Sequence, residues 1–260
     1  MIQAISAIKK VVMTILAAIQ IFQPTGVNGR ELVWSDEFDG DSLDRSKWNV
    51  EVNDFGGWNG ELQYYCDSPD NIIISDGTLK IRALKQDYEG RKYTSARINT
   101  MGKETFQYGR IEARMKLPSF MGAWPAFWML GTSGENWPMC GEIDILETIN
   151  DESIVYGTAH WAVDDSYESS SSSTLEIDKQ IDITQWHTYA IEWSKDRIEW
   201  YVDDIKYHEI NLALDPNKKP LTDGQYILLN FALGGEWPGF VIDDDALPAT
   251  MEVDYVRVYK

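Results

Sequence analysis

The stretch GEIDILETI, residues 141–149, alternates acidic and apolar residues, and this pattern determines how the surrounding chain is interpreted. Isoleucine and leucine dominate it, and an apolar run rich in β-branched side chains favours a strand over a helix. Residues two apart on a strand share a face. Glu142 and Asp144 are therefore expected on one face, while Ile143 and Ile145 point into the opposite layer.

Glu147 breaks this alternation. On a regular strand it would face the packed interior, where an unpaired carboxylate is strongly unfavourable. A β-bulge between Asp144 and Glu147 would insert one extra residue and return Glu147 to the face that carries Glu142, and bulges are common beside active sites. We therefore predict a bulge here. Two glutamates on one curved face can approach the ~5–5.5 Å carboxyl separation of a retaining glycosidase.

The acidic stretch could be a glycosidase site, or it could be a solvated strand face that carries acids at alternate positions. The residues on either side of the stretch distinguish the two. Trp124, Trp128 and Trp137 precede the stretch, and His160 and Trp161 follow it. Aromatic faces bind the C–H groups of sugars, while polar side chains bind the hydroxyls. The combination favours a carbohydrate site.

Several segments resemble glycoside hydrolase family 16. GEIDILE is similar to its active-site signature, in the bulged ExDxxE form of laminarinase-type β-1,3-glucanases rather than the ExDxE form of bacterial lichenases. Eight further segments match in family order: WSDEFDG (34–40), NGELQYY (59–65), YTSARINT (93–100), YGRIEARMKLP (108–118), WPAFWML (124–130), GTAHW (157–161), NFALGGEWPG (230–239) and MEVDYVRVY (251–259). The resemblance extends from about residue 31 to residue 260.

The resemblance implies roles for the three acids. Glu142 would be the nucleophile, Glu147 the acid/base, and Asp144 would hydrogen-bond the catalytic pair. Carboxylates crowded on one face cannot all ionise easily, so at least one pKa is expected to be raised. No cofactor is expected to take part in catalysis.

The resemblance also implies binding positions. Trp124, Trp128 and Trp237 are the expected sugar platforms, and the polar residues that match cleft positions are Asn59, Arg97, His160 and Asn230. Many family members hold a structural calcium ion. The matching ligands here would be the backbone carbonyls of Glu37 and Gly77 and the carboxylate of Asp254, which are the oxygen ligands that calcium prefers.

The expected activity is endo-acting hydrolysis of β-1,3-glucan or mixed β-1,3/1,4-glucan with retention of configuration. Two alternatives remain: a non-catalytic glucan-recognition module, and an agar or carrageenan hydrolase. Recognition modules of this type typically lose the catalytic acids, which this chain keeps. The segments WPAFWML and GTAHW are more similar to laminarinases than to the agar and carrageenan enzymes.

The rest of the chain predicts an antiparallel β-sandwich, which the resemblance narrows to a β-jelly roll whose concave sheet forms the substrate cleft. Gly, Asp, Asn and Pro clusters separate strand-like segments at residues 71–74, 78–83, 110–116, 154–159, 187–193, 198–202, 226–231 and 251–259. Residues 110–116 alternate charged and apolar side chains, as expected of a sheet with one wet face. We predict a flexible loop at 167–174 and a solvated loop at 243–245.

Residues 1–29 are expected to be a secretion signal, and residues 30–260 a single catalytic domain. Lys9 and Lys10 precede an apolar stretch, residues 11–22, that is short for a membrane span. An uncleaved membrane anchor is the alternative. We therefore expect an extracellular or periplasmic protein.

The mature chain is strongly acidic. Removing residues 1–29 takes away two lysines and no acid, so the formal net charge falls from −19 to −21. Such a charge repels nucleic acid and anionic lipid and favours a neutral polysaccharide partner. We expect a monomer that does not contact membranes. Cys66 and Cys140 either form a disulfide in an oxidising compartment or remain two buried thiols.

Overall fold

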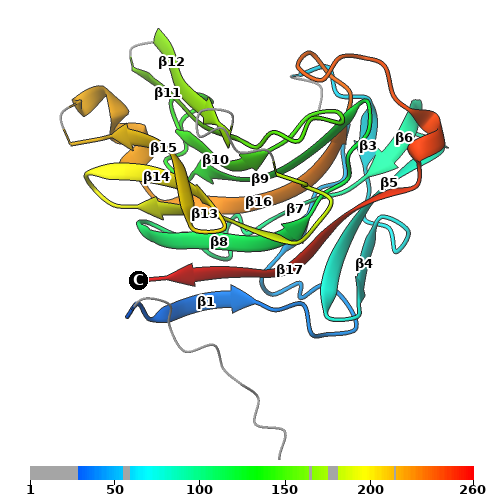
Figure 1. Cartoon of the computed structure of the whole chain (residues 1–260), viewed down its shortest axis with the longest axis horizontal. Coiled ribbons are helices and arrows are strands. Elements are labelled where there is room, and N and C mark those ends of the chain that lie inside the picture. The colour runs from blue at the N-terminus through cyan, green and yellow to red at the C-terminus, as the bar shows by residue number, and fades with distance from the viewer. Residues whose placement is uncertain (1–28, 55–58, 164–165, 175–180, 214) are drawn as a thin grey trace, which may run out of the picture.

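The computed structural model describes residues 29–54, 59–163, 166–174, 181–213 and 215–260, and these form a sandwich of two β-sheets (Figure 1). The predicted signal segment, residues 1–29, lies outside this part of the chain except for Gly29. Among the described residues there is no helix with the length and apolar character needed to cross a membrane.

The larger sheet has ten strands in the order β15-β14-β13-β8-β17-β5-β6-β3, with β1 paired to β17 and β4 to β5. Its pairings are antiparallel except that of β3 with β6. Its strands are β1 (Leu32–Asp36), β3 (Gln63–Tyr65), β4 (Ile72–Ser75), β5 (Thr78–Tyr88), β6 (Arg91–Ser95), β8 (Gly109–Lys116), β13 (His187–Trp193), β14 (Arg197–Val202), β15 (Ile205–Asn211) and β17 (Ala249–Tyr259).

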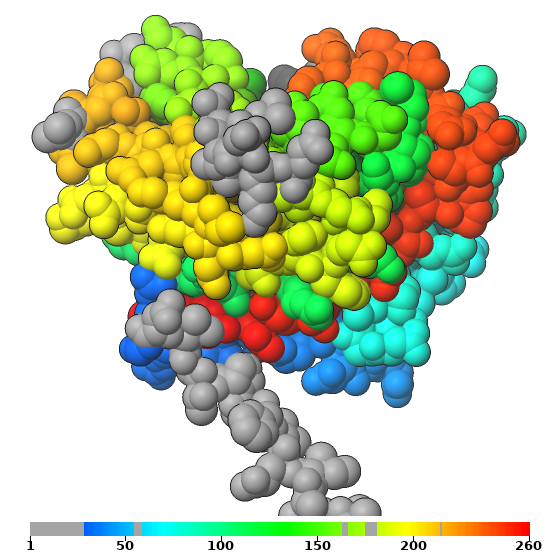
Figure 2. All heavy atoms as spheres, viewed as in Figure 1, coloured from blue at the N-terminus to red at the C-terminus, as the bar shows by residue number. Residues whose placement is uncertain are grey.

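The second sheet has seven strands in the order β12-β11-β10-β9-β16-β7-β2. They are β2 (Asn49–Val50), β7 (Arg97–Asn99), β9 (Ala123–Gly131), β10 (Glu142–Glu147), β11 (Tyr156–Val163), β12 (Ser166–Ser173) and β16 (Gln225–Leu233). In Figure 2 the yellow-green β12 end and the orange segment after β16 rise at the top of the molecule, with a hollow between them. The predicted β-jelly-roll sandwich is confirmed.

Two local predictions were wrong. The serine-rich segment at residues 167–174 is not a loop: β12 pairs with β11 from Ser173 opposite Tyr156 to Ser166 opposite Val163. Its backbone hydrogen bonds come from this hairpin, which its low-complexity composition did not reveal. In β8, Arg110 and Glu112 are buried rather than wet.

Ion pairing explains why these two charged side chains can be buried. Arg110 Nε donates to Glu112 at 2.6 Å, and its Nη2 donates to Asp204 at 2.7 Å. Glu192 accepts from both Arg30 and Arg110. A buried charge is tolerated when it is paired and hydrogen-bonded. The alternation of β8 therefore predicts the strand correctly, and its outer face is wet at Arg114 and Lys116 but not at Arg110 and Glu112.

The core lies between the sheets and is built from their inward-facing apolar side chains. Full burial of a side chain of this size stabilises the fold by about 1.5–3 kcal/mol. The completely buried members include Trp48, Ile81, Ile111, Met115, Phe127, Ile143, Trp200 and Val258. Cys66 and Cys140 are both buried free thiols, so the disulfide alternative was wrong.

The predicted bulge is present in β10. Against β11, the register passes from Asp144 opposite Thr158 to Glu147 opposite Tyr156, so β10 contains one extra residue. The pairing of β10 with β9 shifts within the same stretch. Ile145 and Leu146 are both completely buried in the core cluster. The extra inward residue thereby returns Glu147 to the outer face.

A tryptophan of the opposite sheet holds the bulge. Trp200 on β14 is completely buried, and its indole N–H donates to the backbone carbonyl of Asp144 at 2.7 Å. Gly157 on β11 provides the space for this ring, because a Cβ atom there would lie 2.5 Å from Trp200 Cδ1. Trp200 therefore satisfies a buried carbonyl within the irregular part of β10.

Trp200→Phe should lower the free energy of unfolding by about 1–3 kcal/mol more than a matched control, because it removes the buried indole hydrogen bond to this carbonyl. The control is Trp193→Phe. Trp193 is also buried, on the neighbouring strand β13, but its indole N–H has no partner among the described residues. Chemical denaturation of the three proteins measures the difference, and equal losses in both variants would contradict the bulge anchor.

Candidate active site

The three acids of β10 lie on the outer face of the seven-stranded sheet. Glu142 is opposite His160 on β11, and Asp144 is opposite Thr158 on β11 and Trp128 on β9. Glu147 is opposite Tyr156 beyond the bulge. The sheet thus gathers the predicted catalytic residues and several predicted sugar contacts on one surface.

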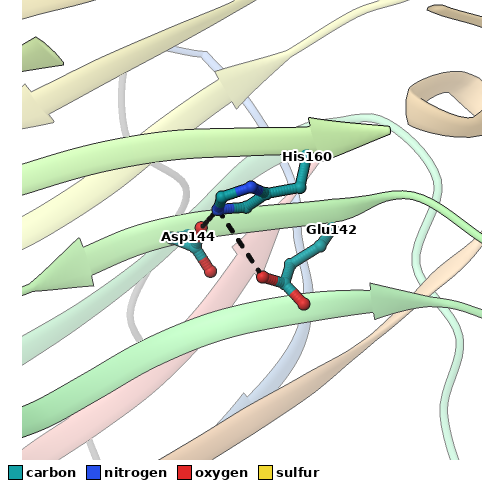
Figure 3. Close-up of side chains that lie close together, drawn as sticks. All are labelled: Glu142, Asp144 and His160. Atoms are coloured by element: carbon teal, nitrogen blue, oxygen red, sulfur yellow. Dashed lines mark ion pairs between the residues drawn. The ribbon is translucent and has the colours of Figure 1, made fainter. Parts of the chain in front are cut away.

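Asp144 and Glu142 converge on His160 (Figure 3). His160 Nε2 lies 3.2 Å from Asp144 Oδ2 and 3.8 Å from Glu142 Oε1. On the other side of the ring, His160 Nδ1 hydrogen-bonds the Tyr167 hydroxyl at 2.7 Å. The ring is therefore held between a tyrosine and two carboxyl groups.

Tyr167 and Trp137 are parts of this site that were not predicted as site residues. Tyr167 stacks on His160 with a ring separation of 5.9 Å, and Trp137 lies 5.6 Å from Tyr167. Trp137 also hydrogen-bonds Glu142 and is half exposed. The low-complexity sequence around Tyr167 concealed it; Trp137 lies just before the acidic stretch, which was the available signal.

Glu147 has a separate aromatic environment. Trp124 Nε1 donates to Glu147 Oε1 at 2.9 Å. Trp237 packs edge-on against Trp124 at 5.7 Å and against Tyr156 at 5.0 Å. Trp237 is 41% exposed, whereas Trp124 is buried, so Trp237 is the one of this pair that presents ring surface to a ligand.

The remaining predicted binding residues lie along neighbouring strands. Trp128 Nε1 donates to the Asn230 side chain at 2.7 Å. The Arg97 guanidinium lies 5.6 Å from the Trp128 ring and forms ion pairs with Glu51 and Glu61. Arg97 is thus already engaged by carboxylates.

Asn59 lies on a loop and contacts Glu61, which also pairs with Arg97. Its side-chain amide donates to Glu61 at 3.5 Å, and its backbone carbonyl accepts from Glu236. A direct contact of any of these residues with sugar stays a prediction.

Burial raises the pKa of all three acids. The pKa of Glu147 is raised to about 8, first by burial and then by the charge of Asp144, with the Trp124 hydrogen bond opposing. Burial raises the pKa of Asp144 to about 8. The pKa of Glu142 is raised by burial and by Asp144, against the opposing effects of His160 and Trp137. Some of these groups therefore keep their protons at neutral pH.

The positions predicted to bind calcium come together on the ten-stranded sheet. Val253 pairs with Leu79 and Val256 with Asp36, which brings Asp254 close to the segments containing Gly77 and Glu37. One oxygen of Asp254 already accepts from Arg114 at 2.6 Å. The residues fit the oxygen chemistry of calcium, with one carboxylate oxygen shared with an arginine.

Comparison with known proteins identifies the family. The model of glycosyl hydrolases family 16 matches residues 59–257. The chain belongs to this family. The family is one of glycosyl hydrolases, and similar proteins are named as glucanases, so the predicted enzyme class is confirmed.

Individual relatives agree with this assignment. The chain is 42% identical to the clotting factor G alpha subunit of Tachypleus tridentatus over 88% of its own length, and spans 34% of that protein. It is 41% identical to the beta-glucanase of Rhodothermus marinus, with 88% and 85% covered. A solved non-specific endo-β-1,3(4)-glucanase of the family superimposes with a TM-score of 0.81 at 36% identity, covering 90% of this chain and 96% of the other.

Asp144→Asn should stabilise the protein increasingly as pH rises from about 4 to about 8. An acid whose pKa is near 3.9 when unfolded and about 8 when folded binds more protons in the folded state, so its contribution to stability is lost as pH rises through this window. Asparagine cannot ionise and avoids that loss. Thermal unfolding of both proteins across this pH range measures the effect.

The control is Asp87→Asn on β5, where the side chain is exposed. Its melting temperature should follow that of the unmutated protein at every pH. An Asp144→Asn protein with a pH-independent difference in melting temperature would contradict the raised pKa.

Proposed function

We propose that this enzyme hydrolyses internal bonds of β-1,3-glucan or mixed β-1,3/1,4-glucan with retention of anomeric configuration. The observation that carries the proposal is the bulge of β10, which puts Glu142, Asp144 and Glu147 on one face. Retention requires a nucleophilic carboxylate and a second carboxyl that acts first as acid and then as base.

Glu147 has the properties of the general acid. Its pKa of about 8 keeps it protonated at neutral pH, so it can protonate the leaving oxygen while Glu142 attacks the anomeric carbon. In the second step, ionised Glu147 takes a proton from water, which attacks the same carbon and releases Glu142. Activity should accordingly fall as pH rises through about 8, because Glu147 then loses the proton it must donate.

Asp144 and His160 influence the ionisation of the nucleophile Glu142, and His160 lowers its pKa. Asp144 has a pKa of about 8 and shares a crowded site with Glu142. A proton on Asp144 removes a negative charge from beside Glu142, and this change, together with the hydrogen bond from Trp137, favours the ionised Glu142 that attacks, in opposition to the effect of burial. Asp144 thus supports the nucleophile Glu142 without being a nucleophile itself.

The substrate proposal rests on charge and on the relatives. A formal charge of −19 disfavours sulfated polymers. The beta-glucanase relative and the solved endo-β-1,3(4)-glucanase are named for β-glucan hydrolysis. Exposed Trp237 and Trp137, near Glu147 and Glu142 respectively, offer rings for sugars on both sides of the acids.

We further propose that the enzyme is exported, works as a monomer and holds a structural calcium ion. The amino-terminal sequence motivates export, and Glu37, Gly77 and Asp254 motivate the ion. Export would be rejected if full-length expression left the protein in the cytoplasm with residues 1–29 attached. Sedimentation tests the monomer, and an unchanged melting temperature after chelation would reject the ion.

Laminarin should be cut internally to short oligosaccharides, because the acids lie on the outer face of the seven-stranded sheet, where the exposed rings of Trp137 and Trp237 can bind sugars of a long chain. Lichenan should also be cut, and products should appear first as β-anomers. Incubation with laminarin, lichenan, agarose and carrageenan, with NMR of the fresh products, measures this. Release from agarose or carrageenan alone would overturn the substrate proposal, and initial α-anomers would overturn retention.

Variants of the two glutamates should separate their roles. Glu142→Gln should abolish turnover, because no glycosyl-enzyme can form. Glu147→Ala should lose activity on glucan but still react with an aryl β-glucoside whose leaving group needs no protonation, and added azide should then yield a β-glycosyl azide. A β-azide from the Glu142 variant instead would mean that the roles are reversed.

A further inference from the structure

The acids of β10 and His160 also form a cluster with the spacing of metal ligands. Glu142, Asp144 and His160 each offer one atom, and these atoms lie within 4.8 Å of one another. His160 Nε2 is 3.2 Å from the Asp144 oxygen and 3.8 Å from the Glu142 oxygen. Ligands at about 2.0–2.1 Å from a tetrahedral zinc ion lie about 3.3–3.4 Å apart. The side chains therefore need only small movements to share one ion.

A second observation points to a ligand at the same place. Asp144 is only 3% exposed, and its Oδ2 accepts no hydrogen bond from the described residues; its one polar contact among them is the ion pair with His160 Nε2 at 3.2 Å. Buried polar atoms without a partner are rare, and each calls for a physical reason. This oxygen is the one that faces His160 in Figure 3, so it points into the cluster.

The donor set selects the kind of metal. One imidazole nitrogen and two carboxylate oxygens suit Zn²⁺ and neighbouring transition metals, and three protein ligands leave a fourth position for water. Calcium prefers six to eight oxygen ligands. A metal-bound histidine usually has its other nitrogen fixed by a hydrogen bond, and the Tyr167 hydroxyl provides that bond to His160 Nδ1 at 2.7 Å.

We propose that Glu142, Asp144 and His160 bind one divalent transition-metal ion, for which Zn²⁺ is the probe, and that the bound ion inhibits the enzyme. The ion coordinates the carboxylate oxygen of Glu142 that must attack the sugar, and it blocks the approach of the substrate. The binding is independent of the proposed function, whereas the inhibition rests on it.

Calorimetric titration of the purified full chain with ZnCl₂, in excess CaCl₂ to fill calcium positions, tests the binding. His160→Gln should raise the Kd for Zn²⁺ about 100-fold, since loss of a mere supporting partner already costs 10–100-fold. Glu142→Gln is a second, nearly isosteric variant that should also weaken binding. Circular dichroism shows whether each variant is folded.

The chain offers a matched control. His187 Nδ1 lies 2.7 Å from Asp203 Oδ2, which makes a second histidine–carboxylate pair on the other sheet. That pair belongs to no three-ligand group among the described residues. His187→Gln should leave the Kd for Zn²⁺ unchanged. Binding lost in this variant and retained in His160→Gln would overturn the proposal, as would the absence of binding in the unmutated protein.

Two further measurements separate binding from its consequence. Co²⁺ in place of Zn²⁺ should give a visible absorption band that disappears with His160→Gln, whether or not the protein cuts any glucan. With laminarin, Zn²⁺ should inhibit competitively and EDTA should restore the rate. Laminarin hydrolysis that continues with Zn²⁺ bound at the cluster would overturn the inhibition alone, and a protein inactive on laminarin would count against the proposed function alone.

Discussion

The arrangement of the active site depends on the single extra residue in β10. A regular strand would place Glu147 in the core, among side chains such as Ile143 and Phe127. The bulge avoids this by turning two consecutive apolar residues inward, and the indole of Trp200 satisfies the carbonyl of Asp144 within it. The geometry of the acids is therefore set partly by the opposite sheet, through a contact that is completely buried.

The crowding of acids that supports the chemistry opposes stability. Burial raises the pKa of Glu147 and Asp144 to about 8, so ionising them in the folded protein is unfavourable. The same burial makes a protonated carboxyl available at neutral pH, which cleavage requires. The ten-stranded sheet treats charge differently: Arg110 is buried among partners that neutralise it. Burial thus raises the pKa values of the acids on the seven-stranded sheet, whereas the buried charge of Arg110 on the ten-stranded sheet is neutralised by its partners.

Most of the fold, and the position of the three acids on one face of β10, could be predicted from local sequence. Parity along β10 was enough to locate the bulge, and resemblance supplied the roles. Contacts between residues distant in sequence were not predictable. Trp200 lies far from Asp144 along the chain, and the sequence around a buried tryptophan does not indicate which carbonyl its indole N–H will bind. Tyr167 was missed because a run of serines says little about pairing, which the neighbouring strand β11 determines.

The serine-rich strand β12 has a consequence for association between molecules. Among the strands that the structure describes it is the outermost of the seven-stranded sheet, so one side of its backbone has no strand partner there. An exposed edge of this kind can recruit a strand from another molecule, particularly when its side chains are apolar. The sequence SYESSSSS offers mainly small hydroxyls and a glutamate instead, with Tyr167 as its one large side chain. The strand whose Tyr167 holds His160 thereby also discourages sheet-to-sheet aggregation.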